Sequence, residues 1–440
     1  MLGEEFMRCL LILILLSVAT SVMALDAGFP LPPEYAKRVN DGIERYRKGS
    51  AVVKVLNAEG KPLSGAVVQV RQVSHDFLFG CAFPNWYIPD FGKKRPEVWS
   101  NFEQYFTSLF NYATTENMIK WTSLEREEGK PDYKMVDAFV EWCQSHDIRI
   151  KGHCLVWGLE RLGFPEWLAR YTPEQVSEKV ENRIKEVVSR YKGKIDIWDV
   201  VNEPLDCHWF ETHMGPDYAV KSYRWAREAN PNAKLVVNEY GTIWNGKDKK
   251  FVEYCQNLMR QGAYLDAIGE QAHDGFLIPS PKKFFDTMDN LAKLGKEIHL
   301  TEITVPSNGT KIDSDFVQGH WTPETHGKYY RYLYTLAFSH RNIKAITLWA
   351  MWDGSSWLEQ GGIISQDWTP KPAYHELDSL INKEWRTNRE GRSGCDGKFY
   401  FRGFYGKYEI TVTYAGKTST SVFHLAEGSQ NVAIIRLNCP

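Results

Sequence analysis

Short apolar runs alternate with longer amphipathic segments through the middle of the chain. Eight of these runs have the length of β-strands, and polar residues follow each of them. Most of the segments between them show the spacing of amphipathic helices. The eight predicted strands span residues 77–83, 110–116, 148–157, 195–203, 234–239, 265–271, 298–304 and 343–350, and two of the clearest helical segments span 173–191 and 325–340.

This alternation predicts an α/β fold in which eight parallel strands close into a (β/α)8 TIM barrel over residues 76–385. A doubly wound open sheet shows the same alternation. That fold commonly carries a glycine-rich phosphate loop after its first strand, and none follows residues 77–83. We therefore favour the barrel.

The two ends of the chain have a different pattern. Residues 25–75 predict a helix that begins at a proline, followed by a β-hairpin around a glycine and proline turn. Residues 386–440 contain strands and tight turns without a helical period. Because an isolated hairpin is only marginally stable, we expect both segments to meet in one small accessory β module beside the barrel. We expect this module to stabilise the barrel rather than to bind a ligand.

Residues 1–24 have the pattern of a secretory signal peptide. Arg8 precedes an apolar run, and Val22-Met23-Ala24 has the small residues of a cleavage site. An uncleaved anchor is the alternative, but the run is slightly shorter than the ~20 residues of a membrane-spanning helix. We therefore expect a secreted protein with no membrane association after cleavage.

Composition narrows the possible partners. A net charge of −2 with 25% charged residues and no basic stripe argues against a nucleic-acid binder. Cysteines outside the signal peptide are scattered without the spacing of a zinc site, so we expect neither metal nor cofactor. An exported protein could pair Cys395 with Cys439. We expect Cys143, Cys154 and Cys255 to be buried thiols, and the chain to be a monomer.

Polar and aromatic side chains follow the predicted strands at the ends that meet at the mouth of a barrel. They comprise carboxylic acids, amides, imidazoles, a lysine and tryptophans. Two carboxylates, amides that bind hydroxyls and tryptophans that stack on sugar rings are what cleavage of a glycosidic bond requires. In chain order these residues are Glu116, Asn117, Lys120, His153, Trp157, Asn202, Glu203, Asn238, Glu239, Gln271, His273, Glu302, Trp349 and Trp357.

Several of these residues lie in motifs that resemble those of glycoside hydrolase family 10, the endo-β-1,4-xylanases. The motifs are GHCLVWG, WDVVNEP, IGEQAH, HLTEITV and KPAYHEL, in that order between Phe79 and Leu380. The resemblance implies hydrolysis of xylan with retention of configuration. Glu302 would be the nucleophile and Glu203 the acid/base. The negative charge of Glu302 would keep a proton on Glu203 until the glycosyl-enzyme forms.

The resemblance also implies roles for the neighbouring residues. Asn202 would bind the 2-hydroxyl of the sugar at the cleavage point, and His273 would orient Glu302. Gln271 and His153 would bind hydroxyls or lie around the nucleophile. The remaining expected contacts are a distal sugar site at Glu116, Asn117 and Lys120, and sugar-stacking or wall-forming tryptophans at 157, 349 and 357. We expect Trp121 and Trp352 to serve in packing.

The tetrapeptide Val-Val-Asn-Glu occurs twice, ending at Glu203 and at Glu239. Only the first copy lies in a family motif, and Glu239 stands where the family often has aspartate. We expect Glu239 either to support its neighbours or to contact substrate. Two alternative functions stay open: another retaining β-1,4-glycanase, acting on mixed-linkage glucan or cellulose, and a barrel that binds polysaccharide without cleaving it.

Overall fold

The structure is a computed structural model that describes residues 27–273 and 277–438. The predicted signal peptide lies outside these residues, and so does Cys439, the predicted partner of Cys395. Cys143, Cys154 and Cys255 are buried free thiols, as predicted. No helix in the described part of the chain is long and apolar enough to cross a membrane.

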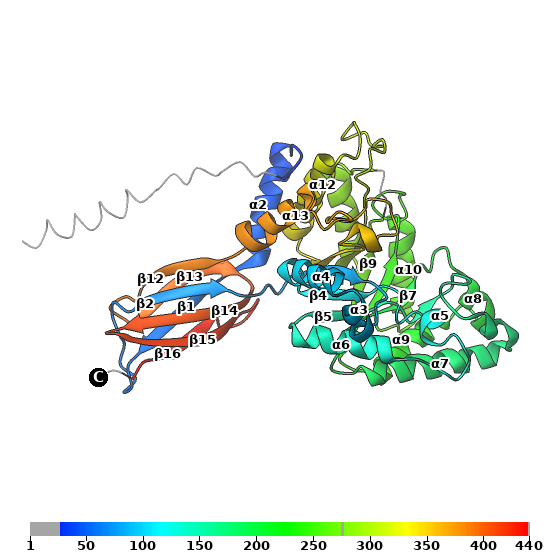
Figure 1. Cartoon of the computed structure of the whole chain (residues 1–440), viewed down its shortest axis with the longest axis horizontal. Coiled ribbons are helices and arrows are strands. Elements are labelled where there is room, and N and C mark those ends of the chain that lie inside the picture. The colour runs from blue at the N-terminus through cyan, green and yellow to red at the C-terminus, as the bar shows by residue number, and fades with distance from the viewer. Residues whose placement is uncertain (1–26, 274–276, 439–440) are drawn as a thin grey trace, which may run out of the picture.

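Eight parallel strands close into a barrel, which confirms the predicted fold (Figure 1). The third strand is divided into two parts that both pair with β7, whereas the sequence predicted one continuous strand over 148–157. In chain order the barrel strands are β3 (Leu78–Phe83), β4 (Tyr112–Thr115), β5 (Arg149–Gly152) with β6 (Val156–Trp157), β7 (Ile197–Asn202), β8 (Lys234–Glu239), β9 (Ala267–Glu270), β10 (Glu297–Ile303) and β11 (Ile343–Leu348).

Helices surround the barrel, and most of them bury one apolar face against the strands. Several begin with proline after a capping hydroxyl, as in α7, where Thr172 and Gln175 form a capping box. The helices that follow barrel strands are α4 (Pro96–Leu109), α6 (Lys134–Ser145), α7 (Pro173–Arg190), α9 (Tyr218–Ala229), α10 (Asp248–Arg260), α11 (Pro281–Ala292), α12 (Pro323–Ser339) and α13 (Pro372–Asp378). Shorter helices are α3 (Ile88–Lys94), α5 (Trp121–Leu124) and α8 (Trp209–Met214).

The segments from the two ends of the chain form one β-sandwich beside the barrel (Figure 1). One sheet has the order β13-β1-β16 and the other has the order β12-β2-β14-β15. The strands are β1 (Lys48–Leu56), β2 (Val67–Gln72), β12 (Asn388–Arg392), β13 (Lys398–Phe404), β14 (Gly406–Tyr414), β15 (Lys417–Leu425) and β16 (Val432–Arg436).

The predicted N-terminal hairpin is therefore wrong, because β1 and β2 belong to different sheets. Both strands alternate buried and exposed residues, and their buried faces meet in one apolar cluster that contains Val53 of β1 and Val68 of β2. The alternation correctly indicates two half-buried strands. It does not specify whether they pair edge to edge or pack face to face.

The sandwich joins the barrel at the end opposite the mouth. Helix α2 (Pro33–Arg47) packs on α12 and leads directly into β1. The buried Arg47 guanidinium donates to the carbonyl oxygens of Phe338, His340 and Ile343 at 2.5–2.7 Å, around the start of β11. These contacts agree with a stabilising role for the module at the base of the barrel.

Candidate active site

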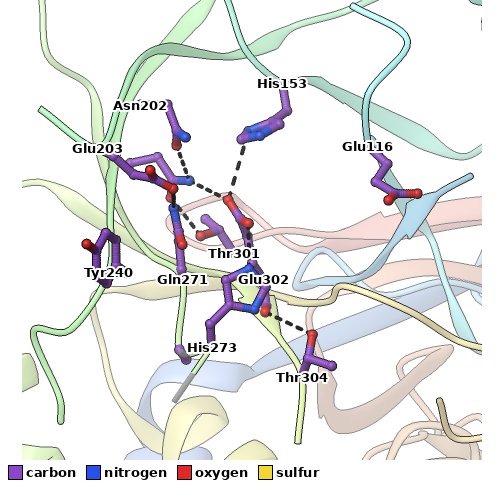
Figure 2. Close-up of polar contacts among 12 residues, drawn as sticks. Glu116, His153, Asn202, Glu203, Tyr240, Gln271, His273, Thr301, Glu302 and Thr304 are labelled. Atoms are coloured by element: carbon purple, nitrogen blue, oxygen red, sulfur yellow. Dashed lines mark hydrogen bonds and ion pairs between the residues drawn. The ribbon is translucent and has the colours of Figure 1, made fainter. Parts of the chain in front are cut away.

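The carboxyl ends of the barrel strands bring the predicted polar residues together (Figure 2). Glu302 is the next-to-last residue of β10, and Glu203 directly follows β7. Gln271 and His273 follow β9. Among these, Glu302 is buried and Glu203 is partly exposed. The two carboxylic acids therefore sit in different surroundings, which their hydrogen bonds define further.

Both carboxylate oxygens of Glu302 have hydrogen-bond partners. Asn238 Nδ2 donates to Oε1 at 2.6 Å, and His273 Nε2 lies 2.8 Å from Oε2. His153 Nδ1 is 4.0 Å from Oε1 (Figure 2). Burial alone would raise the pKa of Glu302, but His153, the His273 hydrogen bond and Lys151 together lower it to about 2. Glu302 is therefore an ionised carboxylate at neutral pH, as a nucleophile requires.

Glu203 leaves its strand through a left-handed backbone conformation. Its φ is 53°, and its amide still donates to the carbonyl oxygen of Asn238 at 2.8 Å. Its carboxyl group accepts hydrogen bonds from Gln271 Nε2 and Trp157 Nε1, both at 2.9 Å, and Cys207 Sγ lies 3.7 Å away. The left-handed conformation turns the chain sharply at the end of β7. The two hydrogen bonds from Gln271 and Trp157 then fix the position of the Glu203 carboxyl group.

Asn238 connects the two acids. Its backbone carbonyl accepts from the Glu203 amide, and its side-chain nitrogen donates to Glu302. The same nitrogen lies 2.8 Å from Asn202 Oδ1, while Asn238 Oδ1 accepts from Thr301 Oγ1 at 2.7 Å. Because this amide is fully buried and its polar atoms are engaged, it fixes the position of each acid relative to the other.

A buried ion pair lies below His153. His153 Nδ1 donates to Asp199 Oδ2 at 2.9 Å, and the Lys151 ammonium is 2.9 Å from the same oxygen. Burial alone would raise the pKa of Asp199, but Lys151 and His153 outweigh it and lower that pKa. Asp199 therefore stays ionised and fixes the orientation of the His153 ring.

The residues of the predicted distal site also contact one another, and Glu116 among them lies apart from the cluster around Glu302 (Figure 2). Asn117 donates to Glu116 at 3.0 Å and accepts from Lys120 at 2.7 Å. The Lys120 ammonium lies 4.6 Å from the centre of the Trp157 ring. Burial raises the pKa of Glu116 to about 7, although Lys120 and the Asn117 hydrogen bond oppose this shift.

The tryptophans divide into exposed and packed residues. Trp357 is 59% exposed and its ring lies 5.4 Å from that of His273, so it is free to meet a ligand. Trp349 is 8% exposed and meets both His153 and His273 edge to face. Trp352 stacks on Trp368 at 4.4 Å, and Trp121 is buried against Trp167. Both of these last two serve in packing, as predicted.

The Glu239 carboxylate is buried against the segments that follow β7 and β8. The residue is fully buried, and its carboxylate accepts from the backbone amides of Leu205 and Tyr240, both at 2.9 Å. Burial raises its pKa to about 7 against the effect of these amides and of Lys247. Of the two predicted roles, the geometry supports the first: Glu239 holds the segment that follows Glu203.

Sequence reasoning missed three residues next to the acids: Lys151, Asp199 and Cys207. A signal was available for two of them, because Lys151 and Asp199 are charged residues inside predicted barrel strands. Such charges are rarely buried without an opposite partner, and pairing them would have been a reasonable inference. No cluster of potential metal ligands occurs among residues 27–273 and 277–438.

Comparison with known proteins places the barrel in a family. Residues 72–379 match glycosyl hydrolase family 10. The chain is 31% identical to anti-sigma-I factor RsgI6 of Acetivibrio thermocellus, over 87% of this chain and 47% of that protein. It is 27% identical to endo-1,4-beta-xylanase 1 of Arabidopsis thaliana, over 86% of this chain and 38% of that protein. The chain thus spans less than half the length of either relative.

A solved structure shows the same barrel. Xylanase 10B from Thermotoga petrophila, crystallised in complex with xylobiose, superimposes with a TM-score of 0.61 and 26% sequence identity. The match covers 70% of this chain and 95% of that one. The β-sandwich at the base of the barrel is thus largely an addition to the shared part.

Proposed function

The chain belongs to glycosyl hydrolase family 10, and we propose that it is a secreted, retaining endo-β-1,4-xylanase that hydrolyses internal bonds of xylan. The contrast between its two acids carries this proposal. Glu302 is buried and ionised, whereas Glu203 is partly exposed and hydrogen-bonded to Trp157 and Gln271. Retaining hydrolysis needs one such carboxylate as nucleophile and one acid that also serves as base.

The reaction would proceed in two displacements. In the first, a Glu302 oxygen bonds to the anomeric carbon while the bond to the leaving oxygen breaks and Glu203 protonates that oxygen. In the second, Glu203 takes a proton from water, the water oxygen bonds to the anomeric carbon, and Glu302 leaves as a carboxylate. Esterification removes the charge of Glu302, so Glu203 can stay ionised after the first displacement and accept the proton of water in the second.

A mechanism-based fluoro-sugar tests the nucleophile. A 2-fluoro xylobioside with a good leaving group should accumulate as an ester, and mass spectrometry of peptides should find it on Glu302. The Glu302→Ala variant should take up no label and should lose activity by about 10⁴-fold or more. Label on another residue would refute the assignment.

The choice of xylan over glucan rests on family membership and on the related xylanase solved with xylobiose. Xylose lacks the exocyclic hydroxymethyl group of glucose, so a closely fitting sugar site excludes glucose by steric clash. Rates on xylo- and cello-oligosaccharides of equal length should differ by at least about tenfold in favour of xylose. Equal rates would point instead to a broader β-1,4-glycanase.

A second candidate function is binding of polysaccharide without cleavage. A relative that is 31% identical to this chain is named an anti-sigma factor and not a hydrolase, so similarity at this level does not by itself imply cleavage. Under this alternative the wild-type chain would bind xylan but release no reducing ends, and Glu302→Ala would bind as the wild type does. Measurement of both binding and release of reducing ends separates the two functions.

Secretion is supported by the pattern of residues 1–24. Expression of the full chain in a host with an intact secretory pathway should deliver protein to the medium. Its N-terminal sequence should begin at Leu25, after the small-residue site at Ala24. Cell-associated protein with an intact leader would indicate an anchor.

A further inference from the structure

Most of the prominent buried cations of the barrel hold the backbone of loops or helix ends in place. Arg47 and Arg183 donate to backbone carbonyl oxygens, and Lys371 contacts Asp353, Ser307 and the carbonyl oxygen of Gln360. These contacts tie neighbouring segments together and give such residues a structural task. Lys151 differs from them, and this difference needs an explanation.

Lys151 lies inside the barrel on β5, and its side chain is fully buried. Among the described residues its ammonium group has no polar partner besides the Asp199 carboxylate, at 2.9 Å. It therefore ties no loop or helix to the barrel. A buried lysine without several hydrogen bonds is costly, so its retention at this position points to an electrostatic task.

The partner of Lys151 leads directly to the reacting group. Asp199 Oδ2 accepts from His153 Nδ1, and that nitrogen lies 4.0 Å from Glu302 Oε1. Lys151, Asp199, His153 and Glu302 are thus a continuous series of buried charges and dipoles below the mouth of the barrel. In the water-poor interior such charges act on one another more strongly than at the surface.

We infer that Lys151 is a positioning residue that balances the charge of Asp199 and thereby stabilises the ionised form of Glu302. Without the ammonium group, Asp199 would present an uncompensated negative charge to His153 and Glu302. This inference rests on the proposed role of Glu302 as nucleophile. Among the residues that the structure describes, the titratable groups around Glu302 are His153, His273, Glu116 and Glu203 (Figure 2), and the Lys151–Asp199 pair.

Three variants test the charge balance. Lys151→Met should move the protonation midpoint of Glu302 upward by about one pH unit, and Asp199→Asn should move it downward. The double variant Lys151→Met/Asp199→Asn restores neutrality, so its midpoint should return close to that of the wild type. Opposite shifts that cancel are a signature that a purely structural role does not produce.

The midpoint can be measured with and without turnover. The acid limb of kcat/KM on an aryl xylobioside reports it in the active protein. Carbon-13 NMR of glutamate carboxyl groups reports it directly, with Glu302→Gln used for assignment. If the wild type hydrolyses no xyloside, the proposed function fails, but the NMR titration still decides the present inference.

Lys371→Met is the matched control, since it also removes a buried ammonium group. It should lower the melting temperature and leave the Glu302 midpoint in place, because its partners hold loops rather than the acids. Lys151→Arg should retain the wild-type midpoint. Should Lys151→Met fail to fold, Asp199→Asn and the double variant still give the comparison. Shifts of the same sign in both single variants, or no shift in either, would overturn the inference.

Discussion

The two copies of Val-Val-Asn-Glu lie side by side on β7 and β8. Asn202 is opposite Asn238 in the parallel register, so the last residues of the two copies begin from equivalent positions. Beyond the asparagines they diverge. Glu203 turns into a left-handed conformation at the mouth of the barrel, whereas Glu239 remains in its strand and is fully buried.

The surroundings of each glutamate follow from this divergence. Glu203 meets side-chain donors from Trp157 and Gln271, so its carboxyl group stays accessible and fixed. Glu239 meets the backbone amides of Leu205 and Tyr240, and Leu205 lies two residues after Glu203. One copy thus supplies an acid to the site and the other holds the segment that carries this acid. An identical tetrapeptide does not imply an identical task.

The strongest test replaces each glutamate by glutamine. Glu203→Gln should lower turnover of xylan by about 10³-fold, because the leaving oxygen then receives no proton. Activated aryl xylosides need no such proton, so their first step should stay close to that of the wild type. Glu239→Gln should lower the turnover of both substrates by about tenfold or less, since this change only loosens the segment that follows Glu203.

Steady-state and burst kinetics on substrates that differ in leaving-group pKa distinguish the two glutamates. A steep dependence on the leaving group in Glu203→Gln alone is the expected outcome. If Glu239→Gln shows this dependence instead, the assignment of the two copies is reversed. Melting temperatures of both variants show whether a loss of activity comes from unfolding.

The asparagines before the glutamates give the next test. Asn238 uses its side-chain nitrogen to reach Glu302, whereas Asn202 uses its oxygen to accept from Asn238. Asn238→Asp would therefore place two carboxyl groups in direct contact at the nucleophile. We expect about a 100-fold loss of kcat/KM near pH 5, an acid limb shifted upward, and a loss of stability of about 3–5 kcal/mol.

Asn202→Asp keeps the accepting oxygen and places its charge beyond Asn238 as seen from Glu302, so its acid limb should shift upward by less than that of Asn238→Asp. Asn202→Asp should be less active than the wild type on substrates that carry a 2-hydroxyl, and as active as the wild type on 2-deoxy analogues. The pH profiles of kcat/KM for the two variants provide the comparison. An equal shift in both would show that Asn238 has no special hold on Glu302.

Sequence reasoning predicted the barrel and most of this site for a physical reason. Each barrel strand is an apolar run with a polar end, and closure of the barrel brings those ends together. The pairing of β1 and β2 could not be predicted, because alternation reveals two faces of a strand but not its neighbour. Different roles for Glu203 and Glu239 were predicted from the residues that flank each copy, but the left-handed φ of Glu203 was not, because side-chain patterns do not encode it. The Lys151–Asp199 pair could have been predicted, because the two residues lie in consecutive strands of the predicted barrel.

The smallest expected effect concerns stability rather than activity. The pKa of Glu239 is raised to about 7 in the folded chain by burial, against about 4.3 in an unfolded one. The folded state thus binds this proton more tightly than the unfolded state does. The resulting cost to folding is absent below about pH 4, grows as the pH rises toward 7, and stays constant above that value. At pH 8 it amounts to about 2–4 kcal/mol.

Glu239→Gln removes this titration but also loses one accepting oxygen that faces the amides of Leu205 and Tyr240. The variant should therefore be less stable than the wild type at pH 4.5, where Glu239 is protonated in the folded wild type and about 40% protonated in the unfolded chain, so its burial costs the wild type little. Between pH 4.5 and pH 8 the free energy of unfolding of the variant, relative to that of the wild type, should rise by about 2–3 kcal/mol. Denaturant unfolding at both pH values measures this change. A difference that stays constant with pH would mean that Glu239 is ionised in the folded chain and that its two backbone amides outweigh its burial.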